Sequence, residues 1–103
     1  MSELMVEGKE CVMRILISVK ELGWFKENFP LIKWEPGHTE IKWNSNVPEE
    51  VEMARKAFEA YKQKHPKAMA FRMNKDDKKD VVELKEFDPN AEMIVVQDWM
   101  QKG

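Results

Sequence analysis

Residues 46–66, NVPEEVEMARKAFEAYKQKHP, carry the clearest structural signal in this sequence. Asn46 is a typical N-cap residue, Glu49 follows at the capping-box spacing, and Pro48 falls in the first turn, where a missing N–H costs nothing. Apolar residues recur at spacings of three and four along one stripe, formed by Val51, Ala54, Phe58 and Tyr61. Acidic residues gather at the start and basic residues at the end, which suits the helix dipole. The segment predicts a helix over 47–64, ended by Pro66.

The residues before this helix predict strands. Residues 11–19, CVMRILISV, are apolar and rich in β-branched side chains, typical of a buried strand. Residues 31–34 and 40–43, LIKW and EIKW, flank the turn sequence EPGH at 35–38 and together predict a β-hairpin. Residues 24–30, WFKENFP, fit neither period, so a helical turn and a hydrophobic loop both stay open. Residues 1–10 are predicted to be a flexible lead-in.

The residues after the helix predict further short strands. In residues 67–74, Met69, Phe71 and Met73 alternate onto one face of a strand. A charged loop at 74–80 leads to a loosely alternating segment at 81–87, a turn at 88–90 and an apolar strand at 92–97. We therefore predict a single α+β domain over 11–103. Its mixed or antiparallel sheet has about five to six short strands, with one main helix packed on one face.

Composition narrows the class of protein. In 103 residues, 43% are hydrophobic and 35% are charged, which is typical of a folded globular chain. The net charge is −2 with both signs mixed along the chain, so the sequence shows no basic stripe for nucleic acid. A lone cysteine, no secretory pattern and no membrane-length apolar run predict a reducing, intracellular location.

The residues able to do chemistry do not form a recognisable catalytic or metal-binding pattern. Cys11 opens an apolar strand, where a thiol commonly acts as a small hydrophobic group. His38 falls in the predicted turn and His65 at the helix end, and two isolated histidines do not match a metal-site spacing. The acids of 76–80 alternate with lysines and lack the glycine of a calcium loop. We expect no enzyme activity, no cofactor and no metal, and a small enzyme that uses Cys11, His38 or His65 stays as a residual alternative.

Tryptophan and methionine are the unusual part of the composition, with four and eight copies. Core packing is one explanation. The other is an exposed surface that binds a protein or a second copy of the chain, since both residue types suit binding surfaces. The candidate binding residues are Trp24, Phe25, Trp34, Trp43, Trp99 and Met100. An alternative partner is a nucleic acid held by Arg14, Arg55, Lys56, Arg72 and the lysines of 75–79 with aromatic stacking.

One resemblance extends over 39–96. The features that carry it are TEIKW, PEEVEMARKAF in the helix, AFR in the strand that follows, and EFDPNAEMIVV at 86–96. In this order they resemble a set of small, uncharacterised proteins encoded in tailed-phage and bacterial genomes. The resemblance implies an accessory protein in the cytoplasm of a bacterium or a phage-infected cell. It implies no activity.

Overall fold

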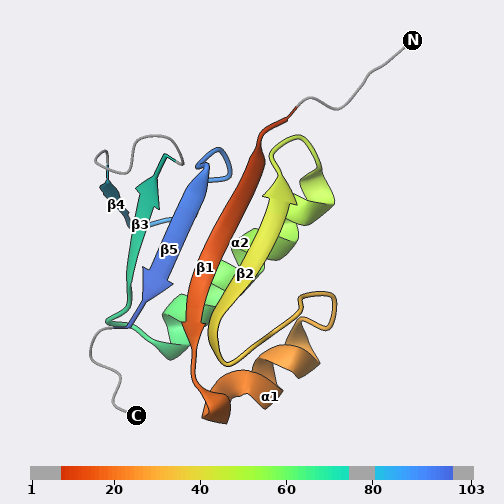
Figure 1. Cartoon of the computed structure of the whole chain (residues 1–103), viewed down its shortest axis with the longest axis vertical. Helices are drawn as coiled ribbons and strands as arrows, with labels where there is room; N and C mark the ends of the chain where they lie inside the picture. Colours follow the sequence, from red (N-terminus) through yellow and green to blue (C-terminus); the bar gives the residue numbers. More distant parts are fainter. Residues whose placement is uncertain (1–7, 75–80, 99–103) are drawn as a thin grey trace.

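The chain folds into one five-stranded sheet with two helices, as its computed structural model shows (Figure 1). The structure describes residues 8–74 and 81–98. Its elements are β1 (Glu10–Ile17), α1 (Val19–Asn28), β2 (Gly37–Asn44), α2 (Pro48–Lys64), β3 (Met69–Met73), β4 (Val82–Leu84) and β5 (Met93–Gln97). The strand order is β2-β1-β5-β3-β4. Because β1 and β5 run parallel while the other neighbours are antiparallel, the sheet is mixed, and the predicted α+β class is confirmed.

The hydrophobic core lies between the sheet and α2, which runs behind the sheet in Figure 1. Successive side chains of a strand point to opposite faces, so alternate residues of β1, β2 and β5, together with Ala70 of β3, enter this core. The sheet contributes Cys11, Met13, Ile15, Ile17, Ile41, Trp43, Ala70, Ile94 and Val96. The helix contributes Ala54, Ala57, Phe58 and Tyr61, which follow the apolar stripe seen in the sequence.

The main helix begins one residue later than predicted, and its predicted cap is wrong. Val47 is the N-cap residue and Pro48 is the first helical residue. The side chain of Asn46 makes no cap, and its backbone N–H donates to the Oδ1 of Asn44 at 2.8 Å. Glu50 reaches back instead, accepting a hydrogen bond from the backbone N–H of Asn44 at 2.8 Å. The tight connection from β2 therefore uses Asn44 and Glu50.

The second helix, α1, answers the question left open at 24–30 and extends beyond it. Ser18 and Glu21 mark the start of α1. The carboxylate of Glu21 accepts hydrogen bonds from the backbone N–H and the hydroxyl of Ser18. This is the Ser-x-x-Glu spacing of a capping box. Phe25 is fully buried on the inner side of α1, against Trp34 at a ring-centroid distance of 4.7 Å. The predicted strand to residue 19 therefore ends at Ile17.

The predicted hairpin of 31–34 with 40–43 is wrong. β2 pairs with β1 along its whole length, from Glu10 opposite Asn44 to Ile17 opposite Gly37. Residues 29–36 form the connection from α1, and Trp34 turns inward, donating its indole N–H to the Phe29 carbonyl at 3.0 Å. Pairing β1 with β2 puts the buried side chains of both strands on the same face of the sheet, so that they share a single core.

The second half of the chain follows the prediction closely. β3 and β5 form within the predicted segments, and β4 occupies 82–84 at the edge of the sheet. Asp88 closes the predicted turn by accepting a hydrogen bond from the backbone N–H of Asn90 at 3.0 Å. Trp43 of β2 donates its indole N–H to the Pro89 carbonyl at 3.0 Å. This hydrogen bond joins the turn to β2, although β1 lies between β2 and β5 in the sheet.

Candidate functional site

The sheet has a second face, opposite α2, which no helix of the described structure covers (Figure 1). We call it the open face. Strand alternation assigns to it the residues that lie between the core positions. They are Glu10, Val12, Arg14 and Leu16 of β1, His38, Glu40, Lys42 and Asn44 of β2, Met69, Phe71 and Met73 of β3, Glu83 of β4, and Met93, Val95 and Gln97 of β5.

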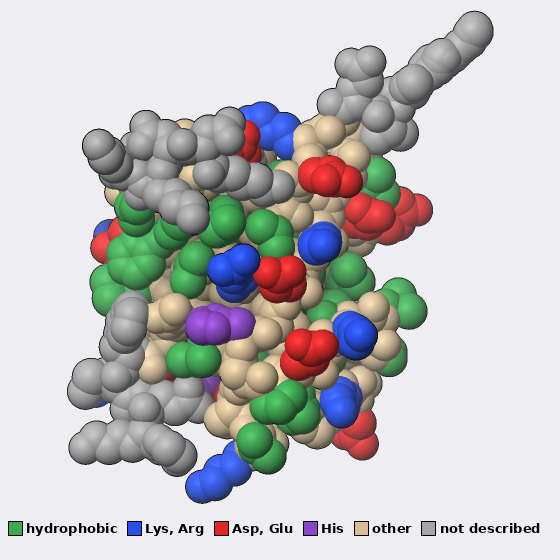
Figure 2. Space-filling view, in the orientation of Figure 1, with side chains coloured by type: hydrophobic (Ala, Val, Ile, Leu, Met, Phe, Trp, Pro, Cys, Tyr) green, Lys and Arg blue, Asp and Glu red, His purple; other side chains and the backbone are tan. Residues whose placement is uncertain are grey.

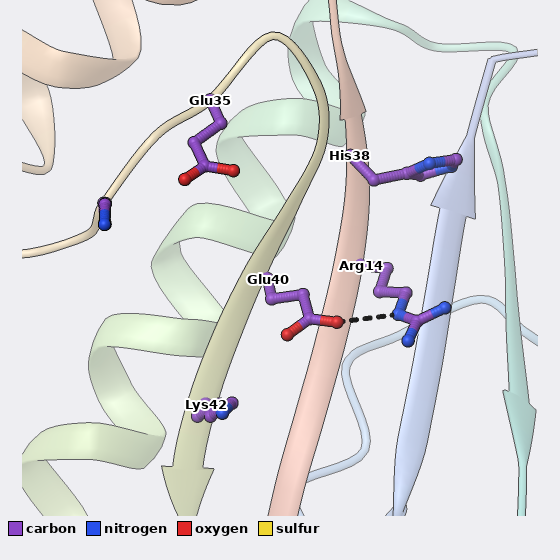
Figure 3. Close-up of a pocket in the computed structure, with 6 residues that line it drawn as sticks. Arg14, Glu35, His38, Glu40 and Lys42 are labelled. Atoms are coloured by element: carbon purple, nitrogen blue, oxygen red, sulfur yellow. Dashed lines mark hydrogen bonds and ion pairs between the residues drawn. The ribbon is translucent and has the colours of Figure 1, made fainter.

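The open face is polar over β2 and the adjoining part of β1. Here a shallow pocket of about 410 Å³ is lined by Arg14, Lys33, Glu35, His38, Glu40 and Lys42 (Figure 3). Arg14 donates from Nε to the Glu40 carboxylate at 3.1 Å, and His38 contacts Gln97 across β1 at 3.5 Å between their Nε2 atoms. All six lining residues are exposed, so none gains the desolvated setting that activates a catalytic acid or base.

The open face is apolar over β5, β3 and the flanks of β1. Two side chains from β1, two from β5 and three from β3 make a continuous patch of seven, which we call the apolar patch: Val12, Leu16, Met93, Val95, Met69, Phe71 and Met73. Figure 2 views this face and shows hydrophobic side chains over β3 and β5, with charged ones over β1 and β2. Six of the seven side chains are half-buried, and the seventh, Val12, is buried.

The predicted binding residues are mostly elsewhere. Phe25, Trp34 and Trp43 are buried in the core, so the expectation that they form an exposed patch is wrong for these three. Their rings fill the space between the sheet and the helices, where a large ring removes the most apolar area from water. Trp24 is 40% exposed on α1, with the Lys64 ammonium 4.2 Å from the centre of its ring. Trp99 and Met100 lie outside the described residues.

Of the cations proposed for nucleic-acid binding, the three arginines are dispersed and each has a carboxylate partner, whereas the lysines of 75–79 lie outside the described residues. Arg55 on α2 contacts Glu52 and Glu59, and its hydrogen bond lowers the pKa of the Glu52 carboxyl below the ordinary value. Arg72 lies 3.4 Å from Asp88. Arg14 is on the open face and Arg55 is on the helix behind the sheet, so the fold does not gather them into one basic surface. The nucleic-acid alternative stays a prediction.

A cluster of ionisable groups, which the sequence did not reveal, surrounds His65 at the end of α2. The imidazole Nδ1 lies 2.8 Å from Asp98 Oδ2, and Nε2 contacts the carboxylate of Glu21 on α1. The Tyr61 ring stacks on the imidazole with centroids 4.4 Å apart. The capping spacing of Ser18 and Glu21 was visible in the sequence, but nothing local indicates that Asp98 and His65 meet.

The His65 cluster is a structural clamp. Each ring nitrogen lies against a carboxylate oxygen, so neither is open to a substrate or a metal ion. Cys11 is buried, with its thiol directed to the Lys9 and Pro89 carbonyls at 3.7 Å each. Within residues 8–74 and 81–98, no three His, Cys, Asp or Glu side chains are placed to share a metal ion.

Comparison of the chain with protein-family models, curated proteins and solved structures found no match. None of the helices in the described residues is long and apolar enough to cross a membrane.

Proposed function

We propose that this chain is a non-enzymatic accessory protein of phage or bacterial origin that binds a protein through the open face of its sheet. The observation that carries the proposal is the apolar patch. A sheet with one solvated face normally alternates apolar and polar residues. In β5, MIVVQ, and β3, MAFRM, this alternation is lost, because Met93, Val95 and Phe71 are apolar on the side away from the core.

Apolar residues on both faces are typical of strands that are covered on both sides. α2 covers only one side, so the apolar patch is the part of the sheet that a partner has to cover. Contiguous apolar patches that reach solvent and are rimmed by polar groups mark protein interaction sites, and six of the seven side chains of the apolar patch are partly exposed. Three of the seven side chains are methionines, whose unbranched and polarisable thioethers adapt to the shape of a partner.

The chemistry of the remaining groups supports a binding role over a catalytic one. The pocket of the open face is exposed, and the imidazole of His65 is committed to two carboxylates. Cys11 lies in the core. Mixed charges at the polar end of the open face, with Arg14 paired to Glu40, fit a polar rim.

Site-specific photo-crosslinking in cells tests the proposal. A benzophenone amino acid replaces Phe71 on the open face and, as the matched control, Lys56, which is exposed on α2 behind the sheet. We expect a discrete protein adduct from position 71 and little or none from position 56. The absence of an adduct at position 71, or equal adducts at both positions, overturns the proposal.

A further inference from the structure

One row of residues across the open face runs Arg14, Val95, Phe71, Glu83. The sheet register places Arg14 beside Val95, Val95 beside Phe71, and Phe71 beside Glu83. The row therefore reads positive, apolar, apolar, negative across β1, β5, β3 and β4. Its centre lies between β5 and β3, which is also the middle of the apolar patch.

This row is complementary to itself under a two-fold rotation. An axis parallel to the strands, passing between β5 and β3, puts β5 opposite β3 of a second copy and β1 opposite its β4. This rotation leaves the position of each row along the strand direction unchanged. Val95 then faces the second copy's Phe71, and Arg14 faces the second copy's Glu83, each contact occurring twice.

The neighbouring row agrees with this arrangement. Met93 lies beside Met73 across β5 and β3, so the same axis puts each methionine opposite the other in the second copy. Val12 lies beside Met93 on the β1 side. Val81, just before β4 and 46% exposed, continues the row on the far side by strand alternation. Val12 and the second copy's Val81 then meet, and this row is apolar throughout.

The polar character of the edge strand β2 also agrees with this arrangement. An interface centred between β5 and β3 uses β1, β5, β3 and β4 and leaves β2 outside it. β2 is the strand whose open-face residues are all polar: His38, Glu40, Lys42 and Asn44. Packed sheets lie about 10 Å apart with their strands nearly aligned, a gap that an extended arginine and a glutamate can bridge together.

We infer that the occupant of the open face is a second copy of this chain, packed sheet against sheet about a two-fold axis between β5 and β3, with Arg14 paired to the partner's Glu83. The inference rests on the proposed function and names its partner. Both residues are available for the pairing. Arg14 is paired to Glu40 through Nε, and its two terminal nitrogens can donate to a second carboxylate. Glu83 has no ion pair with any other described residue.

Charge reversal in purified full-length protein tests the inference, with sedimentation equilibrium over a concentration series as the measurement. We expect a dimer whose dissociation constant rises about tenfold or more in Arg14→Glu and in Glu83→Arg, because each variant sets like charges face to face twice. The double variant Arg14→Glu with Glu83→Arg restores the pairing and returns the constant to within about threefold of the starting value. Lys42→Glu is the control, since it makes the same charge change on β2, outside the interface.

Three results overturn the inference: a monomer at every concentration, a double variant no tighter than the single ones, or a Lys42→Glu variant as weak as Arg14→Glu. Phe71→Lys is a further variant at the centre of the interface and is expected to abolish the dimer, with circular dichroism verifying its fold. A monomer whose position-71 crosslinker still forms an adduct with another protein overturns the second-copy inference and leaves the proposed function standing. A monomer with no adduct overturns both.

Discussion

The imidazole of His65 and the carboxylate of Asp98 lie 2.8 Å apart, joining the end of α2 to the residue after β5. Glu21 of α1 occupies the other ring nitrogen, so one side chain ties three elements together. The side chains of the three residues are only 10–17% exposed. Breaking these contacts is costly, because the two carboxylates would lose their partner while staying shielded from water.

We predict that His65→Gln lowers the free energy of unfolding by about 3 kcal/mol, since the shorter amide cannot contact both shielded carboxylates at once. Urea unfolding measures the loss. His38→Gln is the control, because His38 is exposed on β2, and its change should stay within about 0.5 kcal/mol. Equal losses in the two variants would contradict the role of the clamp.

Tyr61 predicts a specific alkaline sensitivity. Its ring is fully buried, and its hydroxyl donates to the Leu16 carbonyl at 2.7 Å. Burial raises the pKa of Tyr61 well above its ordinary value, and the negative charges of Glu21 and Asp98 raise it further. Above about pH 10 the unfolded chain therefore releases this proton while the folded chain keeps it, so stability falls as the pH rises.

The Tyr61→Phe variant separates this effect from that of other alkaline groups. At neutral pH we expect it to lose about 1 kcal/mol, for the hydrogen bond to Leu16. Between about pH 9 and pH 11 it should lose less additional stability than the original chain, by up to about 1.4 kcal/mol for each pH unit above 10. Urea unfolding at the two ends of this range measures the difference. Parallel losses in both proteins would show that Tyr61 does not titrate on unfolding.

Two glycines give opposite predictions for the same substitution. Gly37 opens β2 with a φ of +87°, a region that disfavours side chains. Gly37→Ala should therefore cost about 1 kcal/mol. Gly23 lies inside α1, where an added Cβ meets no atom within 4 Å. Gly23→Ala should stabilise the protein by about 0.5–1 kcal/mol, and thermal unfolding of both variants measures the two signs.

Cys11 is predicted to be inert in the folded protein. It is 2% exposed and its neighbours are core side chains of β1 and the Pro89 carbonyl. Reaction with an aromatic disulfide reagent should therefore be slow in native buffer and complete within the mixing time in denaturant, because reagent access requires unfolding. Rapid labelling of the native protein would show that the β1–turn contact opens readily.

Local patterns were enough to predict α2 and most strand positions. The stripe that ends in Phe58 and Tyr61 repeats at the helix period, and each apolar run in β1, β3 and β5 is short and bounded by turn residues. α1 was predicted only as one of two possibilities at 24–30, because Gly23 interrupts its middle and its apolar residues fit neither the helix nor the strand period. The hairpin was wrong because the pairing between β1 and β2 joins residues that are 20 positions apart at Ile17 and Gly37 and 34 positions apart at Glu10 and Asn44.

The role of the aromatic residues was decided by packing. Trp34 and Trp43 have a polar N–H that suits a binding surface, and the fold satisfies it inside, on the carbonyls of Phe29 and Pro89. Composition shows that large rings are plentiful, and it does not show on which side of the sheet they lie. For this reason the candidate binding surface is formed by the methionines and Phe71 of the open face rather than by the predicted tryptophans.

The sequence by itself determined that Met69, Phe71 and Met73 share one face of a strand, because side chains alternate with a period of two. Only the tertiary structure decided that this face is the open one. The chain has one long amphipathic helix and a sheet whose inner strands are apolar on both sides, so α2 can cover one face only. Which face it covers depends on the pairing of all five strands, and that pairing joins residues far apart in the chain.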